Sequence, residues 1–308
     1  MTTILYSHPA CLVHDTGPGH PESAKRLQAL LGRLDEPQFG GLERRSAPCA
    51  ERGQLAHAHG MPYISKVFDT LPTQGEAFIA PDTVMSPGTL GAALRAAGAA
   101  CAAVDAVLGG EARNAFCAVR PPGHHATAIN TMGFCIFNNV AIGVEQARRV
   151  HGLERVAIVD FDVHHGNGTE AIFRTDPNVM VASIHQSLIF PKTGSGSDIG
   201  VGNIVNVPMV RISSPEEFRD AFKDKIVPRL LEFAPELLFV SAGFDAHVRD
   251  PLGDQRLMTA DFAWLMRELT TVANARCGGR LVSVLEGGYD DEAVAQAGAA
   301  HVGQLMDH

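Results

Sequence analysis

The 308-residue sequence lacks the features of membrane and secreted proteins. No apolar run approaches the roughly 20 residues that a membrane helix requires, and the short apolar start is followed at once by polar, Gly/Pro-rich sequence rather than by a signal peptide core. The six cysteines are scattered without a C-x-x-C pair, and several lie in apolar runs where a thiol packs as a small hydrophobic group. We therefore expect a reduced, cytoplasmic protein that does not contact a membrane.

The chain has too few basic residues for a protein that binds nucleic acid through its overall charge. The 25 Lys and Arg face 34 Asp and Glu, which gives a formal net charge of −9. There is no repeat of a solenoid period and no low-complexity linker, so we expect residues 1–308 to form a single domain. With 45% hydrophobic residues, the chain can bury a sizeable core. Nothing in the sequence indicates an oligomeric state.

Short apolar runs rich in β-branched residues alternate with longer, helix-like segments. We predict strands at 3–6, 115–119, 156–159, 179–184, 204–207, 237–240 and 281–285, and helices at 21–34, 89–108, 138–151, 215–233, 259–275 and 290–306. Alternation of this kind is typical of a mostly parallel sheet with helices on both faces. The expected fold is therefore a three-layer α/β/α domain.

Five predicted strands run into polar, Gly-rich segments at their C-terminal ends. These segments are residues 120–125, 160–168, 183–185, 241–246 and 286–290. Ligands bind at this edge of open α/β sheets. His, Asp and Tyr at five separate strand ends are hard to attribute to packing alone, so the sequence predicts a functional site there.

Residues 160–164 (D-F-D-V-H) alternate polar and apolar side chains, so an extended backbone places the three polar ones on one side. Without a cation, such a cluster would suffer desolvation and carboxylate repulsion, which a divalent metal relieves. Asp245, at another strand end, would complete a set with Asp162 and His164 that leaves a position open for water and substrate. Mixed oxygen and nitrogen ligands suit zinc, and also iron(II) or cobalt. A two-manganese arrangement like that of the arginases is the alternative.

Two adjacent histidines and a tyrosine complete the predicted site. His124 and His125 follow a rigid Pro-Pro-Gly turn and can reach one water, so that one takes its proton and one protonates the departing amine. Asp160 is the natural hydrogen-bond partner of one imidazole and Asn167 of the other. Tyr289 follows a Gly-Gly pair and can donate a hydrogen bond to the oxyanion of a tetrahedral intermediate. These groups fit acyl chemistry better than arginase chemistry.

The same motifs, in the same order, resemble those of the arginase/deacetylase superfamily, and within it the class II histone deacetylases and their bacterial relatives. They are R-P-P-G-H-H-A from 120, G-F-C-x-F-N-N from 133, D-F-D-V-H-H-G-N-G-T from 160, S-A-G-F-D-A from 241 and E-G-G-Y from 286. Nearly the whole chain is covered, because similarity to the family's rim loops and early helices extends into the N-terminal third. The resemblance implies a catalytic Zn²⁺ on Asp162, His164 and Asp245, a general base and acid pair in His124 and His125, and a transition-state donor in Tyr289.

The resemblance also implies substrate-binding residues and a structural ion. Gly133, Phe134 and Phe190 would line a narrow tunnel for the acyl-lysine chain. A structural K⁺ site would lie, largely on backbone carbonyls, near Asp160, Asp162, His164, Ser183 and Ile184. A second potassium site would lie near Phe173.

Two positions refine the assignment within the family. Asn167 stands where class I enzymes carry an aspartate, which favours class II. Leu252 stands where the polyamine-selective deacetylase of this class has a gatekeeping glutamate, and leucine offers a cationic polyamine only apolar contact. Glu22 and Asp82 are further carboxylates that we expect near the mouth of the tunnel, which keeps a polyamine substrate open.

We therefore expect a zinc-dependent amide hydrolase that removes acetyl or other acyl groups from lysine side chains. Its partner would be an acylated protein or a small acylated amine. Two alternatives stay open: the same chemistry on an acetylated polyamine or another small amide, and a non-catalytic module that binds acylated ligands. A binder needs no general base, so the histidine pair and Tyr289 disfavour the second alternative.

Overall fold

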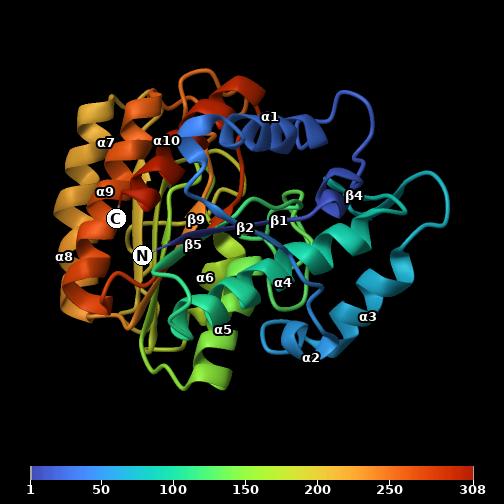
Figure 1. Cartoon of the computed structure of the whole chain (residues 1–308), viewed down its shortest axis with the longest axis horizontal. Helices are drawn as coiled ribbons and strands as arrows, with labels where there is room; N and C mark the ends of the chain where they lie inside the picture. Colours follow the sequence, from blue (N-terminus) through green and yellow to red (C-terminus); the bar gives the residue numbers. More distant parts are fainter. Residues whose placement is uncertain (1, 308) are drawn as a thin grey trace.

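The fold is built on one long parallel sheet. A computed structural model describes residues 2–307 (Figure 1). Eight strands follow the order β2-β1-β5-β10-β9-β6-β7-β8, and every neighbouring pair is parallel. In chain order they are β1 (Thr3–Ser7), β2 (Glu43–Ser46), β5 (Asn114–Cys117), β6 (Val156–Asp160), β7 (Val179–Gln186), β8 (Ile204–Met209), β9 (Leu237–Ala242) and β10 (Leu281–Leu285).

Helices cover both faces of this sheet, which confirms the predicted three-layer α/β/α fold (Figure 1). On one face α1 (Ala24–Leu34) and α9 (Thr259–Cys277) pack against α10 (Asp291–Met306), and on the other α4 (Thr89–Leu108) packs against α5 (Asn139–His151). The shorter elements are α2 (Arg52–Leu55), α3 (Met61–Thr70), α6 (Asn167–Phe173), α7 (Pro215–Ala221), α8 (Val227–Phe233), and a hairpin of β3 (Ala77–Ala80) and β4 (Thr83–Met85).

The central strands are buried along their whole length because helices lie on both sides of them. This burial holds for β5, β6, β7, β9 and β10. The prediction omitted β2, which has the sequence Glu-Arg-Arg-Ser and no apolar run. β2 is an edge strand whose side chains are alternately half-buried and exposed, so it does not need the apolar signature of a central strand.

The helix predicted at 215–233 is interrupted in its middle. A π-helical turn, Phe222–Ile226, separates α7 from α8. Pro228 stands in the first turn of α8 and has no amide hydrogen with which to continue the ladder of an α-helix. The interruption therefore follows from a single proline in an otherwise helical segment.

Among the residues described, one helix has the length and composition of a membrane span. It is α4, with 20 residues, a mean hydropathy of 1.4 and 67% of its most apolar window buried inside the structure. The sequence analysis found no such apolar run, because Arg95, Asp105 and two glycines interrupt a segment that is otherwise rich in alanine. Burial of this extent is also typical of a core helix.

Candidate active site and metal centre

Polar side chains from four neighbouring strands meet at the C-terminal edge of the sheet. Asp162 follows β6, Asp245 follows β9, Tyr289 follows β10, and the pair His124 and His125 follows β5. These strands are adjacent in the order β5-β10-β9-β6, although they are far apart in the sequence. The parallel sheet therefore brings the predicted site residues into one place.

Asp162, His164 and Asp245 form a compact set of candidate metal ligands. One donor atom of each lies within 4.8 Å of the others, and all three residues are buried. His164 Nδ1 is 3.1 Å from Asp162 Oδ1 and 3.0 Å from Asp245 Oδ2. Ligand atoms around one tetrahedral zinc ion are roughly 3.3 Å apart, given metal–ligand bonds of about 2.0–2.2 Å. The spacing of the three donors therefore fits one such ion.

The backbone around the two carboxylates leaves room for them and fixes their orientation. A Cβ at Gly243 would lie 2.2 Å from Asp162 Oδ2, and a Cβ at Gly287 would lie 2.3 Å from Asp245 Oδ2. The amide of Gly287 donates to Asp162 Oδ2 at 2.8 Å, and that of Val163 donates to Asp245 Oδ1 at 2.7 Å. Each carboxylate is thus anchored by an amide while one oxygen faces the His164 ring.

Without a cation, this ligand set is electrostatically unfavourable. Burial, and then the charge of Asp162, raise the pKa of Asp245 to about 8. Burial alone would lower the pKa of His164, but its contacts with the two carboxylates raise it to about 10. The cluster therefore retains protons at neutral pH, and a divalent cation would replace them. The chemistry of the donor set fits a metal site.

The two adjacent histidines have different hydrogen-bond partners. His124 Nδ1 is 2.9 Å from Asp160 Oδ2, whereas His125 Nδ1 is 2.8 Å from Asn167 Oδ1, as predicted. Burial would lower the pKa of His124, but the charges of Asp162 and Asp160 raise it well above the usual range. Burial and the charge of His124 hold the pKa of His125 well below that range. The surroundings therefore favour the cationic form of His124 and the neutral form of His125.

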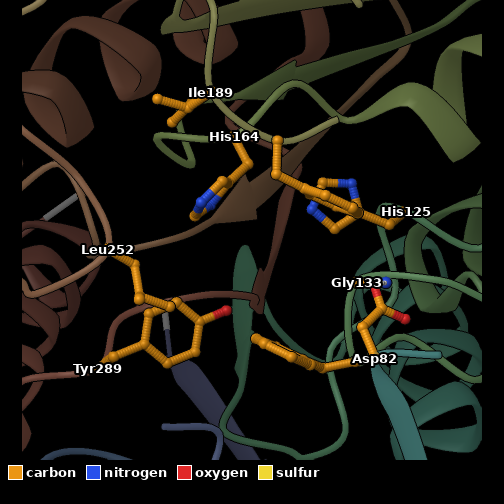
Figure 2. A pocket seen from close by; sticks show the side chains of 9 residues that line it. Asp82, His125, Gly133, His164, Ile189, Leu252 and Tyr289 are labelled. Carbon is orange, nitrogen blue, oxygen red and sulfur yellow. Dashed lines mark hydrogen bonds between the residues drawn. The ribbon is translucent and has the colours of Figure 1, made fainter. Parts of the chain in front are cut away.

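A pocket of about 310 Å³ opens over these groups (Figure 2). Its lining residues are Asp82, His125, Gly133, Phe134, His164, Ile189, Phe190, Leu252 and Tyr289. All four predicted substrate-binding residues, Gly133, Phe134, Phe190 and Leu252, are among them. Figure 2 shows the Tyr289 hydroxyl directed into the space that His125 and His164 also face. Ile189 was not predicted, because it has no polar group and lies in no motif.

Gly133 and Phe134 form a strained turn at the rim of this pocket. Both have positive φ angles, 58° and 67°, and a Cβ at Gly133 would lie 2.3 Å from the His125 ring. Asp82 Oδ2 accepts a hydrogen bond from the Gly133 amide at 2.9 Å. The turn places the Phe134 ring edge-on to Tyr289, with ring centroids 5.9 Å apart. Only glycine at 133 is compatible with this close approach.

Comparison with known protein families identifies the family of this chain. Residues 20–305 match the family described as "Histone deacetylase domain". The chain belongs to the histone deacetylase family. Domains of this family hydrolyse amides and are generally metal-dependent, so the chain is a hydrolase and the alternatives of an arginase and a non-catalytic binder are set aside.

Several named relatives of this deacetylase span nearly all of its chain. It is 38% identical to "Histone deacetylase 14, chloroplastic" of Arabidopsis thaliana over 96% of its own length and 74% of the relative's. The "Histone deacetylase-like amidohydrolase" of Pseudomonas aeruginosa is 37% identical, with 98% and 86% covered, and the human "Polyamine deacetylase HDAC10" is 36% identical, with 99% and 46% covered. The solved HDA15 HD domain superimposes with a TM-score of 0.94 at 30% identity, over 99% of this chain and 88% of that one.

A buried ion network supports the turn at residues 120–125, called here the histidine turn. The role of this network was not predicted from the sequence. Arg120, which begins the turn, contacts both oxygens of Glu22 at 2.6 and 2.7 Å. Arg26 contacts Glu22 at 2.9 Å and donates to the carbonyl of Glu286 at 2.8 Å. Glu22, Arg26 and Arg120 are all fully buried. The expectation that Glu22 lies near the tunnel mouth is therefore wrong, because its ion pairs with two arginines lie in the core. Arg120 is 98 positions from Glu22 in the sequence, so no local pattern predicts this pair.

Glu22→Gln should destabilise the deacetylase by about 3–5 kcal/mol, because it leaves two buried guanidinium groups without their counter-charge. Denaturant unfolding at pH 7 measures this loss. Burial opposes ionisation, but Arg120 and Arg26 hold the pKa of Glu22 well below its usual range. Its stabilising contribution is therefore present above the ordinary glutamate pKa and is lost as the pH falls through the lower folded-state pKa. Glu43→Gln, in a half-buried surface pair with Arg45, is the control and should cost less than about 1 kcal/mol. Equal losses in the two variants would contradict the prediction.

Glu286 holds the histidine turn from β10. Its Oε2 accepts hydrogen bonds from the amides of Gly123 and His124 at 2.7 and 3.1 Å. Burial raises the pKa of Glu286 to about 7. Together with His124 and Cys135 it forms a second group of metal-type side chains, but this group shares no residue with the first. The hydrogen bonds from the amides of Gly123 and His124 already explain the position of Glu286.

The residues expected around potassium lie beside the ligand set. Asp160 is in register with Ser183 on β7 and with Ser241 on β9. Asp160 Oδ1 accepts a hydrogen bond from the amide of Asp162 at 3.1 Å, and Ser183 Oγ lies 2.9 Å from His185 Nδ1. Ile184 is fully buried within β7. Asp160 therefore lies between β7 and β9, and the potassium site stays a prediction.

Proposed function

We propose that this deacetylase hydrolyses the amide of acyl-lysine side chains, with one zinc ion held by Asp162, His164 and Asp245. The observation that carries the proposal is the position of His164, which belongs both to the ligand set and to the pocket lined by His125 and Tyr289. One imidazole and two carboxylates suit zinc and leave a position open for the reacting groups. When bound, zinc would polarise the acyl carbonyl and lower the pKa of the attacking water.

The hydrogen-bond partners of the two histidines suggest their roles. Asn167 Oδ1 is an acceptor, so His125 donates from Nδ1 and keeps a lone pair on Nε2. His125 also lines the pocket, so it is placed to take the proton of the attacking water. His124 is paired with the carboxylate of Asp160, which stabilises its cationic form. We therefore assign His125 as the general base and His124 as the electrostatic stabiliser. The pair would then return the proton to the departing amine.

Tyr289 would donate a hydrogen bond to the oxyanion of the tetrahedral intermediate. Burial, and then the charges of Asp162 and Asp245, raise the pKa of its hydroxyl well above the usual range. The hydroxyl therefore stays protonated at physiological pH, as a hydrogen-bond donor must. The ring is positioned by its edge contact with Phe134 and by the Arg26 guanidinium, 5.8 Å from its centroid.

The walls of the pocket favour an acylated lysine over a charged chain. Phe134, Ile189, Phe190 and Leu252 are apolar, and Asp82 supplies the one carboxylate among the described residues that line the pocket outside the ligand set. The four methylenes of an acyl-lysine carry no charge, so their burial between such side chains is favourable at about 25 cal/mol per Å². An acylated protein is therefore the proposed partner.

Two further features complete the proposal. A structural potassium ion would lie near Asp160, Asp162, His164, Ser183 and Ile184, which come from adjoining strand ends. A reducing compartment, the cytoplasm, suits the six cysteines, all of which are free and five of which are buried. Oxidation of these buried thiols would require the core to open.

An acetylated polyamine is the second candidate substrate. The observation that favours it is the carboxylate of Asp82 in the lining of the pocket, together with the polyamine deacetylase among the relatives. Leu252, also in the lining and 38% exposed, speaks against it, because it offers a cation no charge. The two substrates use the same catalytic groups, so only their competition distinguishes them.

Leu252→Glu should raise kcat/KM for acetylspermidine relative to an acetyl-lysine peptide by about tenfold, because a carboxylate at the pocket attracts the free amines of the polyamine. Steady-state kinetics with both substrates give the ratio. Leu252→Gln, which has a similar size but no charge, should leave the ratio close to that of the parent enzyme. A glutamate variant with the parent's ratio would show that residue 252 does not select the substrate.

The proposed function is tested by a panel of substrates at equal concentration with the zinc-loaded enzyme. The panel contains acetyl-, trifluoroacetyl- and longer acyl-lysine peptides, together with acetylspermidine and acetylputrescine. We expect peptides to be hydrolysed with the higher kcat/KM. Turnover of polyamines alone would show that the second candidate, an acetylated polyamine, is the substrate. No turnover of any amide would refute both proposals.

A further inference from the structure

A second groove adjoins the active-site pocket at its rim. It has a volume of about 400 Å³ and lies between the loop at residues 16–21 and the β3–β4 hairpin. Asp82 and Phe134 line both the groove and the pocket. Figure 2 shows Asp82 beside Gly133 at the edge of the pocket. A substrate whose side chain fills the pocket therefore has its next residues close to the groove.

The groove carries negative charge that no basic side chain balances. Glu76 and Asp82 are in its lining, and no Lys or Arg is among the described lining residues. Asp82 is fixed by the Gly133 amide and by the Thr83 hydroxyl at 2.8 Å. The Glu76 carboxylate is exposed, makes no ion pair within residues 2–307, and lies 2.7 Å from the position of a Cβ on Gly17. Both carboxylates are thus available to a ligand from solvent.

Apolar surface lies directly beside these carboxylates. Phe78, on β3, is 68% exposed, and Pro18, Pro21 and Val84 also line the groove. The remaining titratable group is His20, for which burial lowers the pKa, so it is neutral at pH 7 and does not offset the carboxylates. An apolar wall with a carboxylate at its end suits a side chain that has an alkyl stem and a cationic head.

We propose that this groove binds a Lys or Arg side chain of the protein substrate, close to the acyl-lysine in sequence, through ion pairs with Glu76 and Asp82. Alternate side chains of an extended peptide are about 6.6 Å apart on one face, so the residue two positions from the acyl-lysine is the one expected to enter. This inference rests on the proposed function and adds a sequence preference to it. Glu76 is then a specificity residue that does not touch the reacting atoms.

The test uses acetyl-lysine peptides that carry Arg, norleucine or Glu at each of the two positions before and after the acyl-lysine. We expect the zinc-loaded enzyme to prefer Arg to norleucine at one position two residues away, by about three- to tenfold in kcat/KM, mainly through KM. The preference should weaken between 50 and 500 mM salt. Glu76→Gln should bring the Arg-to-norleucine ratio close to one, and Asp69→Asn, an exposed carboxylate on α3 outside the groove lining, should preserve the parent ratio.

The outcomes separate this inference from the function on which it rests. Peptides that are all hydrolysed with the same kcat/KM, or a preference that Glu76→Gln leaves intact, overturn the groove assignment and keep the acyl-lysine function. Discrimination by Glu76 that is confined to acetylated polyamines overturns the assignment to a peptide side chain. Failure to hydrolyse any peptide overturns both.

Discussion

Replacing Asp245 by asparagine is expected to lower kcat/KM for an acetyl-lysine peptide by roughly a thousandfold or more and to abolish stoichiometric zinc binding. Groups that only orient a metal ligand contribute about 10- to 100-fold, so the loss of a ligand charge should exceed that. The amide oxygen of asparagine can still accept the hydrogen bond that Val163 donates to Oδ1. The substitution also removes a buried carboxyl group whose ionisation is disfavoured by burial and by Asp162. The variant should therefore stay folded, and the loss should be specific to metal and activity.

Elemental analysis after dialysis, thermal unfolding and steady-state kinetics together check this expectation. Asp254→Asn is the matched control, because Asp254 is on the same loop but pairs with Arg211 at the surface. The control should keep its zinc and its turnover. An Asp245→Asn enzyme that binds one zinc per chain and turns over at the rate of the parent would exclude Asp245 as a ligand.

Tyr289→Phe is expected to lower kcat by about 10²- to 10³-fold with little change in KM, since one oxyanion donor contributes this much. Phenylalanine keeps the ring that packs against Phe134 and lies beside the Arg26 guanidinium. The substitution therefore removes a hydroxyl and little else. Zinc content should stay at one per chain, which separates this effect from loss of a ligand.

Tyr6→Phe provides the same chemical change away from the site. The Tyr6 hydroxyl donates to the carbonyl of Ala102 at 3.2 Å, so its removal should affect stability but not kcat. Kinetics of both variants at saturating peptide settle the comparison. A Tyr289→Phe enzyme with the kcat of the parent, or with a raised KM alone, would assign Tyr289 to substrate binding rather than to the transition state.

The fold was predictable where a buried element appears in the sequence as an apolar run. Strands covered on both faces, such as β6 and β9, are continuous apolar runs of fixed length, and seven of the eight sheet strands were located. β2 was not, because an edge strand with one neighbour can be built from charged residues. The short helices α2, α3 and α6 and the hairpin were also missed, since their stability comes from contacts with distant residues rather than from a local pattern.

The site was predictable because its chemistry is local to strand ends. The alternation of residues 160–164 places two ligands on one face, and the order of the strands brings Asp245 beside them. The support of the site was not predictable in the same way. Glu22 reaches Arg120 across 98 positions, and the groove at Glu76 arises where two loops distant in sequence meet. Such contacts depend on the packed structure, and a single sequence carries no periodic signal for them.

The most direct test of the account is to titrate zinc into the metal-free enzyme while turnover of an acetyl-lysine peptide and bound metal are both measured. We predict that turnover rises in proportion to bound zinc and stops rising at one ion per chain. Full turnover in the metal-free enzyme, or no turnover of the peptide at one zinc per chain, would contradict zinc-dependent acyl-lysine hydrolysis at Asp162, His164 and Asp245.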